Sequence, residues 1–170
     1  MLLLLLSIGA CATKQELPLT VDSVLTDWSL GPVRIGMTVD QIENAVGALD
    51  SQDIETFPED SACYYIWQRD GPDGVSFMIV DGVLARIEIS NPDMKTERGS
   101  KVGDSEADIM ATYDNNVIVE TRPYSGEPDH YLIVDSPGRI YSTLFETSNG
   151  KVEYFRAGQY DPVRWIEGCF

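Results

Sequence analysis

The sequence has little of what most catalytic and metal sites are made of. It contains one histidine, His130, and three cysteines without a Cys-x-x-Cys spacing, which argues against a zinc site. It has no Gly-x-Ser-x-Gly elbow to supply a nucleophile. Asp129 precedes His130, but adjacent residues of a strand point to opposite faces. We therefore expect no catalytic residue, no metal site, no cofactor and no enzymatic activity.

Basic residues are also scarce. Twelve Lys and Arg stand against 28 Asp and Glu, which gives a formal net charge of −16, with the acidic residues spread along the chain. A field of this sign repels nucleic acid, so we expect no nucleic-acid partner. It would attract basic proteins or divalent cations, although solubility alone is a sufficient reason for an acidic surface.

No apolar run is long enough to cross a membrane. The stretch that begins with Leu2 to Leu6 has about ten apolar residues, whereas a transmembrane helix needs about 20, so it is typical of a signal peptide. The segment from Ile8 to Cys11 resembles a bacterial lipobox, in which the cysteine receives a diacylglycerol before cleavage. No Lys or Arg precedes the leucines, unlike most signal peptides. The alternative is an ordinary secretory signal with an incidental cysteine.

This resemblance implies a subcellular location and a domain organisation. Residues 1–10 would be the lipoprotein signal peptide, residues 11–23 the lipidated N-terminus with a polar tether, and residues 24–170 a single domain. In enterobacterial lipoproteins an aspartate after the lipidated cysteine favours retention in the inner membrane. By resemblance, Ala12 implies the periplasmic face of the outer membrane, with the lipid on Cys11 as anchor.

The two remaining cysteines fit an oxidising compartment. If Cys11 carries lipid, Cys63 and Cys169 are left as an even pair, and a disulfide between them is the natural pairing. It would close a loop of roughly 100 residues and hold the C-terminal end on the body of the domain. The alternative is two buried free thiols.

An internal repeat governs the expected fold. Ile35 to Val46 matches Val102 to Tyr113 with every position displaced by 67. In each copy a glycine precedes a hydroxyl residue, Thr38 or Ser105, that is placed to cap a helix. Gln41 completes the spacing of a capping box in the first copy, and an aspartate at that place in the second is a near match. Both copies predict a short amphipathic helix.

Runs with strand character follow each helix. They are Cys63–Gln68, Val75–Val80 and Val83–Ile89 in the first half, and Tyr131–Val134, Ser142–Thr147 and Val152–Ala157 in the second. Asp81-Gly82 and Asn149-Gly150 predict tight hairpin turns, because both residues of such a turn need positive φ. In the first hairpin apolar and polar residues alternate, so we expect one buried face and one wetter face. Phe77 and Phe145 are displaced by 68, so the hairpin recurs with the helix.

The repeat predicts an α+β fold. We expect tandem α-β-β-β units, about residues 28–92 and 93–170, that form one antiparallel sheet of about six strands with short helices packed on one face. On the two glycine-containing helix starts and the strand runs after them, the duplication resembles the β-lactamase inhibitory protein. The single unit is similar to the small outer-membrane-assembly lipoproteins of the BamE (SmpA/OmlA) group. The pattern, including residues 156–158 and 167–169 at the end, also resembles uncharacterised proteobacterial lipoproteins.

Aromatic residues supply the candidate binding face. Five of them lie in the predicted strands and are candidates to contact a partner: Tyr64, Tyr65, Trp67, Tyr131 and Tyr154. On a sheet face turned away from the helices they would form the kind of surface that anchors protein interfaces. The alternative is that they fill the core or cover the C-terminal segment.

These expectations favour one function over two others. The leading hypothesis is a non-catalytic module, anchored in the envelope, that binds an envelope protein through its sheet, as the resembled inhibitor and assembly lipoproteins do. The alternatives are an envelope-maintenance component without a discrete ligand and an enzyme of unrecognised type. A deep pocket with converging Asp, Tyr and His130 groups would favour the enzyme.

Overall fold

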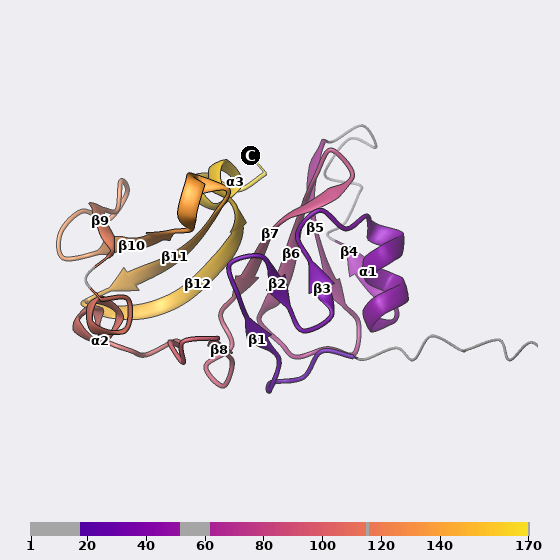
Figure 1. Ribbon diagram of the computed structural model, residues 1–170, viewed down its shortest axis with the longest axis horizontal. Helices are drawn as coiled ribbons and strands as arrows, with labels where there is room; N and C mark the ends of the chain where they lie inside the picture. The colour runs from indigo at the N-terminus through magenta and orange to yellow at the C-terminus, as the bar shows by residue number, and fades with distance from the viewer. Residues whose placement is uncertain (1–17, 52–61, 115, 170) are drawn as a thin grey trace, which may run out of the picture.

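The computed structural model describes residues 18–51, 62–114 and 116–169, and its fold is mostly β (Figure 1). The first half contains β1 (Val24–Leu25), β2 (Ser29–Leu30), β3 (Val33–Arg34), α1 (Val39–Val46), β4 (Leu49–Ser51), β5 (Cys63–Gln68), β6 (Val75–Val80) and β7 (Val83–Ile89). The second contains β8 (Lys95–Thr96), α2 (Glu106–Thr112), β9 (Ile118–Thr121), β10 (His130–Asp135), the 3-10 turn η2 (Pro137–Arg139), β11 (Tyr141–Ser148), β12 (Lys151–Gln159) and α3 (Tyr160–Arg164).

The strands form two sheets. The large sheet has eight strands in the order β4-β5-β6-β7-β12-β11-β10-β9, and every neighbouring pair is antiparallel. The small sheet has the order β3-β2-β1-β8, with β1 and β8 parallel. The strands after α1 form one half of the large sheet, those after α2 form the other, and the two halves meet where β7 pairs with β12.

The expected fold class is therefore wrong. The structure has eight strands in the main sheet instead of about six, and a second sheet stands beside the helices. Each helix is followed by four strands rather than three, because β4 and β9 extend the sheet at its two edges. These edge strands are short, and β9 is exposed along its whole length, so neither has the alternating pattern that reveals a half-buried strand.

Both helices begin with a full capping box. The backbone nitrogen of Gln41 donates to the Thr38 hydroxyl at 3.4 Å, and the Thr38 nitrogen donates to the Gln41 side chain at 3.0 Å. The equivalent bonds between Ser105 and Asp108 are 3.2 and 3.1 Å. The aspartate that was only a near match in the sequence is thus a working partner, because its shorter side chain still reaches the Ser105 nitrogen.

The two halves repeat each other in backbone detail. Gly36 donates to the Leu84 carbonyl at 2.8 Å, and Gly103 donates to the Val152 carbonyl at 2.9 Å, so each helix start is tied to the last strand of its own half. Register shifts occur after Met78 in β6 and after Glu146 in β11, which are equivalent positions. The same bulge in both halves re-aims the following side chains in the same way.

The hairpin turns form as expected. Asp81 and Gly82 have φ values of 49° and 80°, and Asn149 and Gly150 have 50° and 75°. Positive φ at both residues matches the right-handed twist of the flanking strands, so both turns reverse the chain with two residues. These turns place β6 beside β7 and β11 beside β12.

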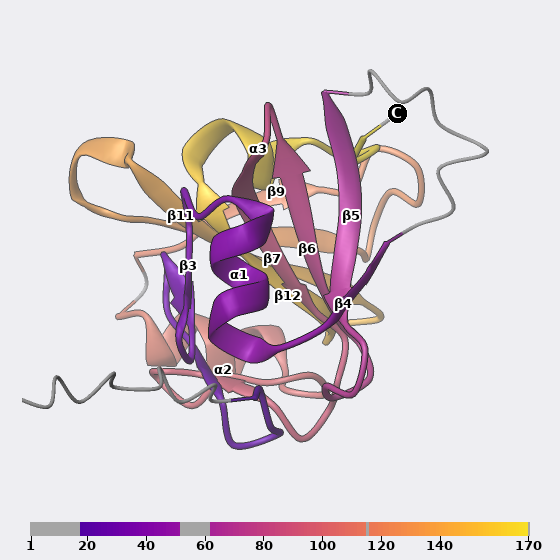
Figure 2. The ribbon, with the colours of Figure 1, turned by 90° about the vertical axis from the view of Figure 1, so that its right-hand side faces the viewer.

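The core lies on one face of the large sheet, which we call the inner face. Ile42 of α1, Ile109 of α2 and Leu30 of the small sheet are fully buried against it in one apolar cluster. Figure 2 shows α1 lying along this face. Leu19, in the segment expected to be tether, is 3% exposed in the same cluster, so the folded part begins before residue 24.

The opposite face of the large sheet, the outer face, is covered in part by the C-terminal segment. Val163 of α3 packs in a second apolar cluster with Tyr131, Ile133 and Leu144. Met78 and Arg86, on the face expected to be wetter, are 0% and 2% exposed. That expectation is wrong here because the chain folds back over this face after β12.

The described part of the chain contains no helix that is both long and apolar enough to span a membrane. The predicted signal peptide and Cys11 lie outside the described residues.

Candidate functional site

The outer face is organised around the strand pair that joins the two halves. In the β7–β12 register, Ile89 faces Phe155, Glu88 faces Arg156 and Ile87 faces Ala157. Glu88 and Arg156 are 68 positions apart, which is the displacement between the two hairpins, so equivalent residues of the two halves face each other. A pseudo-two-fold axis perpendicular to the sheet therefore passes between Glu88 and Arg156, which we call the dyad pair.

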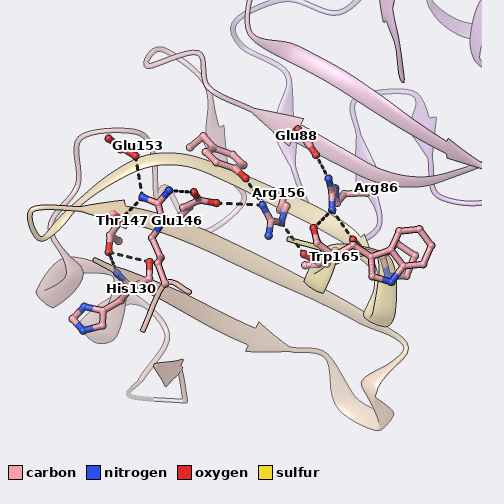
Figure 3. Close-up of polar contacts among 12 residues, drawn as sticks. Arg86, Glu88, His130, Glu146, Thr147, Glu153, Arg156 and Trp165 are labelled. Carbon is pink, nitrogen blue, oxygen red and sulfur yellow. Dashed lines mark hydrogen bonds and ion pairs between the residues drawn. The ribbon is translucent and has the colours of Figure 1, made fainter. Parts of the chain in front are cut away.

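Arg156 is a buried cation, with 1% of its surface exposed. Its Nε donates to the Val163 carbonyl at 2.7 Å, and its Nη1 contacts the Tyr154 hydroxyl and lies 3.4 Å from a Glu146 carboxylate oxygen (Figure 3). Its Nη2 has no hydrogen-bond partner within the described residues. Because a buried charge without partners is costly, Glu146 and the tail carbonyl are what make this position tolerable.

Arg86 holds the C-terminal segment in place. We call residues 160–169 the tail. The Nη1 of Arg86 donates to the carbonyls of Pro162 at 2.7 Å and Trp165 at 3.0 Å, and its Nη2 donates to the Tyr65 hydroxyl at 2.7 Å. Glu88 forms an ion pair with the same guanidinium. The tail is thus fixed by an arginine that the sheet itself orients.

A disulfide between Cys63 and Cys169 fixes the end of the tail, as expected from cysteine parity. The sulfur atoms are 2.07 Å apart and the Cα atoms 5.2 Å apart, and the bridge joins β5 to the last part of the chain. A Cβ atom added at Gly168 would lie 2.6 Å from the Tyr65 hydroxyl, so the tail passes directly over this tyrosine.

Burial raises the pKa of three tyrosines on the outer face. Desolvation is the main cause at Tyr65, Tyr131 and Tyr154, and the shift is large at Tyr154. Nearby carboxylates, Glu88 at Tyr65 and Glu146 at Tyr131, raise the pKa further. All three hydroxyls therefore stay protonated and neutral near pH 7.

The five candidate aromatic residues do not form one surface. Tyr64 lies on the inner face against the core, opposite Ile79. Tyr65 lies under the tail, and Tyr131 is 6% exposed, with the Arg156 guanidinium 5.7 Å from its ring centre. Only Trp67, 37% exposed, and the half-buried Tyr154 line an open surface together.

That surface is a cleft on the first half of the outer face, which we call the open cleft. It has a volume of about 540 Å³. Its lining comes from β5, β6, β7, β12 and the β5–β6 loop: Trp67, Gln68, Arg69, Gly71–Ser76, Glu88, Ile89, Ser90 and Tyr154. The cleft thus combines the aromatic rings of Trp67 and Tyr154 with the carboxylate of Glu88.

Sequence reasoning missed the charged residues of the outer face. Arg86, Glu88, Glu146 and Arg156 were not candidates, because a charged residue in a strand is normally solvated. A signal was present, since Glu88 and Arg156 occupy equivalent positions of the two repeats. Only the fold-back of the tail makes that coincidence meaningful.

His130 lies away from the open cleft. Its Nδ1 is 2.9 Å from Glu106 and its Nε2 is 3.1 Å from Glu127. The hydrogen bond to Glu106 raises its pKa, and the charge of both carboxylates adds to that effect. No group of three or more His, Cys, Asp or Glu residues suited to hold a metal is found within the described ranges.

Comparison with known proteins gives a fold without a function. One similar solved structure is the crystal structure of the uncharacterised protein YfeY from Escherichia coli, with a TM-score of 0.50 and 14% identity. The match covers 84% of this chain and 100% of that chain. At this identity the likeness concerns the fold alone. No protein-family model matches the chain, and no curated protein matches it.

Proposed function

We propose that the protein is a non-catalytic protein-binding module that docks an envelope partner in the open cleft. The single observation that carries this is the cleft itself, which exposed Trp67 lines together with the half-buried Tyr154 and Glu88 on a rigid sheet. Aromatic side chains in a hollow are the usual anchors of protein interfaces, because they bury a large area with little loss of conformational freedom.

The platform beneath the cleft supports this reading. Phe77 and Ile87 are fully buried on the inner face behind it. Strands packed in this way hold their side chains more precisely than a loop does. The cleft lies within the range of about 300–1,000 Å³ that is usual for binding sites. A partner would therefore meet a preformed surface.

The charge of the chain supports a basic partner. With a net charge of −16, the protein attracts positively charged surfaces over long range and speeds their encounter. Attraction of this kind weakens as salt rises.

The proposed location is the periplasmic face of the outer membrane, with the lipid on Cys11 as the anchor. The lipobox-like segment from Ile8 to Cys11 supports it. The disulfide between Cys63 and Cys169 supports an oxidising compartment, since such bonds are rare in reducing ones. The substitution Cys11→Ser should release the protein from membranes and abolish labelling by a fatty-acid analogue. Unlabelled wild-type protein would contradict the anchor.

Photo-cross-linking tests the docking surface. Benzoylphenylalanine replaces Ser90 at the rim of the cleft, or Asn44 on the exposed side of α1 as the control position. In intact envelopes we expect one discrete adduct from position 90 and none from position 44. Adding Trp67→Ala should abolish that adduct. Trp28→Ala is the matched control, because Trp28 is 41% exposed, similar to Trp67, and is not part of the cleft lining.

The proposal has clear ways to fail. Equal loss of the adduct in the Trp28 and Trp67 variants would show an effect on folding or abundance. The same adduct from position 44, or no discrete adduct from position 90, would contradict docking in the cleft. Melting temperatures of all variants, measured on purified protein, should lie close together because both tryptophans are exposed.

A further inference from the structure

The open cleft and the seat of the tail occupy equivalent positions about the pseudo-two-fold axis. The tail helix α3 packs on β11, β12 and β7. The axis exchanges β11 with β6, β12 with β7 and β7 with β12. The open cleft is lined by these exchanged strands, β6, β7 and β12. The second half thus contains, already filled, the site that is open in the first half.

The correspondence extends to side chains. Val163 of the tail covers Ile133 and Leu144. Leu144 is equivalent to Ser76 at the displacement of 68. Ile133 is equivalent to Trp67, because each lies two residues after the tyrosine that faces Glu146 or Met78. Both Trp67 and Ser76 line the open cleft. The apolar floor under Val163 is thus replaced by the wider ring of Trp67, which an aliphatic group can also cover.

The charges at the two sites are reversed. In the filled site Arg156 donates to the Val163 carbonyl. Its equivalent in the open cleft is Glu88, which can only accept hydrogen bonds when ionised. Arg86 donates to the tail carbonyls of Pro162 and Trp165, and its equivalent in the cleft is the neutral Tyr154. A ligand of the open cleft must therefore donate a hydrogen bond to Glu88, at the position where the tail accepts one from Arg156.

One oxygen of Glu88 is left for such a donor. Its Oε1 takes the Arg86 ion pair and the Tyr65 hydroxyl at 3.2 Å, while its Oε2 has no partner in the described part of the chain. The side chain is 21% exposed and lines the cleft. Arg69, the one cation of the lining, is already paired with Asp50 at 2.8 Å, and Asp73 adds a further negative charge.

From this symmetry we infer that the open cleft seats a short polypeptide segment of the partner, placed as the tail is placed in the second half, with a lysine or arginine directed at Glu88. This rests on the proposed function and names the chemistry of its partner. An aliphatic residue next to the cation covers Trp67, as Val163 covers Ile133. The cation also lies near the faces of Trp67 and Tyr154, which attract positive charge.

An oligosaccharide is the competing occupant, because a tryptophan with nearby carboxylates also suits sugar rings. The tail favours a polypeptide over a sugar, because it is itself a polypeptide bound at the equivalent site of the second half. The experiment includes both ligand classes as probes.

The test uses isotope-labelled protein carrying Cys11→Ser, so that it is free of lipid. The probes are acetyl-Gly-Pro-Val-Lys-Gly-amide, the same peptide with norleucine in place of lysine, and the tetramer of N-acetylglucosamine. We expect the lysine peptide to shift the amide signals of Ser76 and Ser90 and the indole signal of Trp67. Its affinity should exceed that of the norleucine peptide by about tenfold, as a charge-assisted hydrogen bond implies.

Two variants locate the effect. Glu88→Gln should remove the preference for lysine while leaving weak binding of both peptides. Because this change also touches Arg86, Ser76→Lys provides an independent test: a cation placed in the cleft should abolish binding of the lysine peptide. Spectra of the free variants, matching the wild type outside the cleft, confirm that each is folded. Glu153→Gln, an exposed carboxylate outside the cleft lining, is the matched control and should bind as the wild type does.

The inference is overturned if the norleucine peptide binds as tightly as the lysine peptide, if shifts fall outside the cleft, or if only the sugar shifts the cleft signals. These results are separable from failure of the proposed function. If cross-linking in envelopes gives a Trp67-dependent adduct but the lysine peptide binds no more tightly than the norleucine peptide, the docking function stands and the proposed lysine or arginine is refuted. If the lysine peptide binds selectively but no discrete adduct forms in envelopes, the cation-binding cleft stands and docking of an envelope partner is refuted.

Discussion

The two halves of the large sheet share a backbone but not a surface. In the second half the tail covers the outer-face site and buries Arg156, whereas the equivalent site around Trp67 in the first half is open. The tail also crosses Tyr65 and Arg86 of the first half, but it leaves the open cleft uncovered. The same bulge and the same helix-to-strand bonds occur in both halves. A few substitutions at equivalent positions, together with a segment of about ten residues at the end of the chain, therefore decide whether a site of this fold is filled or free.

The largest expected effect tests whether the halves share one core. Phe77 and Phe145 are equivalent and both 0% exposed. Phe77→Ala and Phe145→Ala should each lower the free energy of unfolding by about 3–5 kcal/mol, because each leaves a cavity in the same apolar cluster. Urea unfolding followed by circular dichroism measures both. Two separate transitions in either variant would show that the halves unfold independently.

The next effect concerns the tail, which fills the outer-face site of the second half and is bonded to the first half at Cys63. Replacing both Cys63 and Cys169 by serine should lower the free energy of unfolding by about 2–4 kcal/mol, because the unfolded chain gains freedom. Hydrogen exchange should speed up most in residues 160–168. Cys11→Ser is the control and should leave stability unchanged. Unaltered exchange in the tail would mean that Arg86 and Arg156 hold it without the disulfide.

A smaller effect compares the two capping boxes. Thr38→Ala and Ser105→Ala should each lower stability by about 1 kcal/mol, since each removes the acceptor for a backbone nitrogen at a helix start. The matched controls Thr38→Ser and Ser105→Thr keep the oxygen and should lie near the wild type. A clear difference between the two alanine variants in urea midpoint would break the equivalence of the halves at this point.

The smallest expected effect is a pH dependence of the free energy of unfolding that comes from His130, in the second half. His130 has a raised pKa because of Glu106, and the neighbouring charges are Glu127, Asp129 and Arg122. Its charged form stabilises the fold fully below its ordinary pKa of about 6.5, and that stabilisation is lost as pH rises through the raised value. As pH rises from about 6 through the raised pKa of His130, the wild type should therefore lose more stability than His130→Gln.

Parallel stability profiles for these two proteins would exclude a role for the His130 charge. The first half offers a natural contrast. Tyr131 and Tyr65 face the equivalent residues Glu146 and Met78, so Tyr64 occupies the position of His130. Substitution of Tyr64 by Phe should leave the pH profile unchanged.

Local patterns predicted much of the hairpin structure. The expected runs for β5, β6 and β7 match the observed bounds, because alternation and two-residue turns are short-range signals. The edge strands β4 and β9 and the two-residue strands of the small sheet were missed. Their hydrogen bonds are made to distant segments, and their sequences are too short or too polar to show a period.

The candidate binding residues were predicted in part. The register that separates Tyr64 from Tyr65 cannot be read from one strand, because a shift by one residue exchanges the two faces. The arginines were missed for another reason, since burial of Arg86 and Arg156 depends on a tail that returns from far along the chain.

The sequence by itself determined the repeat, the helix caps, the turns and the pairing of two cysteines, because each is encoded in neighbouring residues or in simple counting. Tertiary structure alone decided how the halves join, with Glu88 facing Arg156 across β7 and β12. It also decided which copy of the outer-face site the tail fills. Such outcomes depend on contacts between segments distant in the chain, whose free energies are settled only when the whole sheet closes and its outer face is covered.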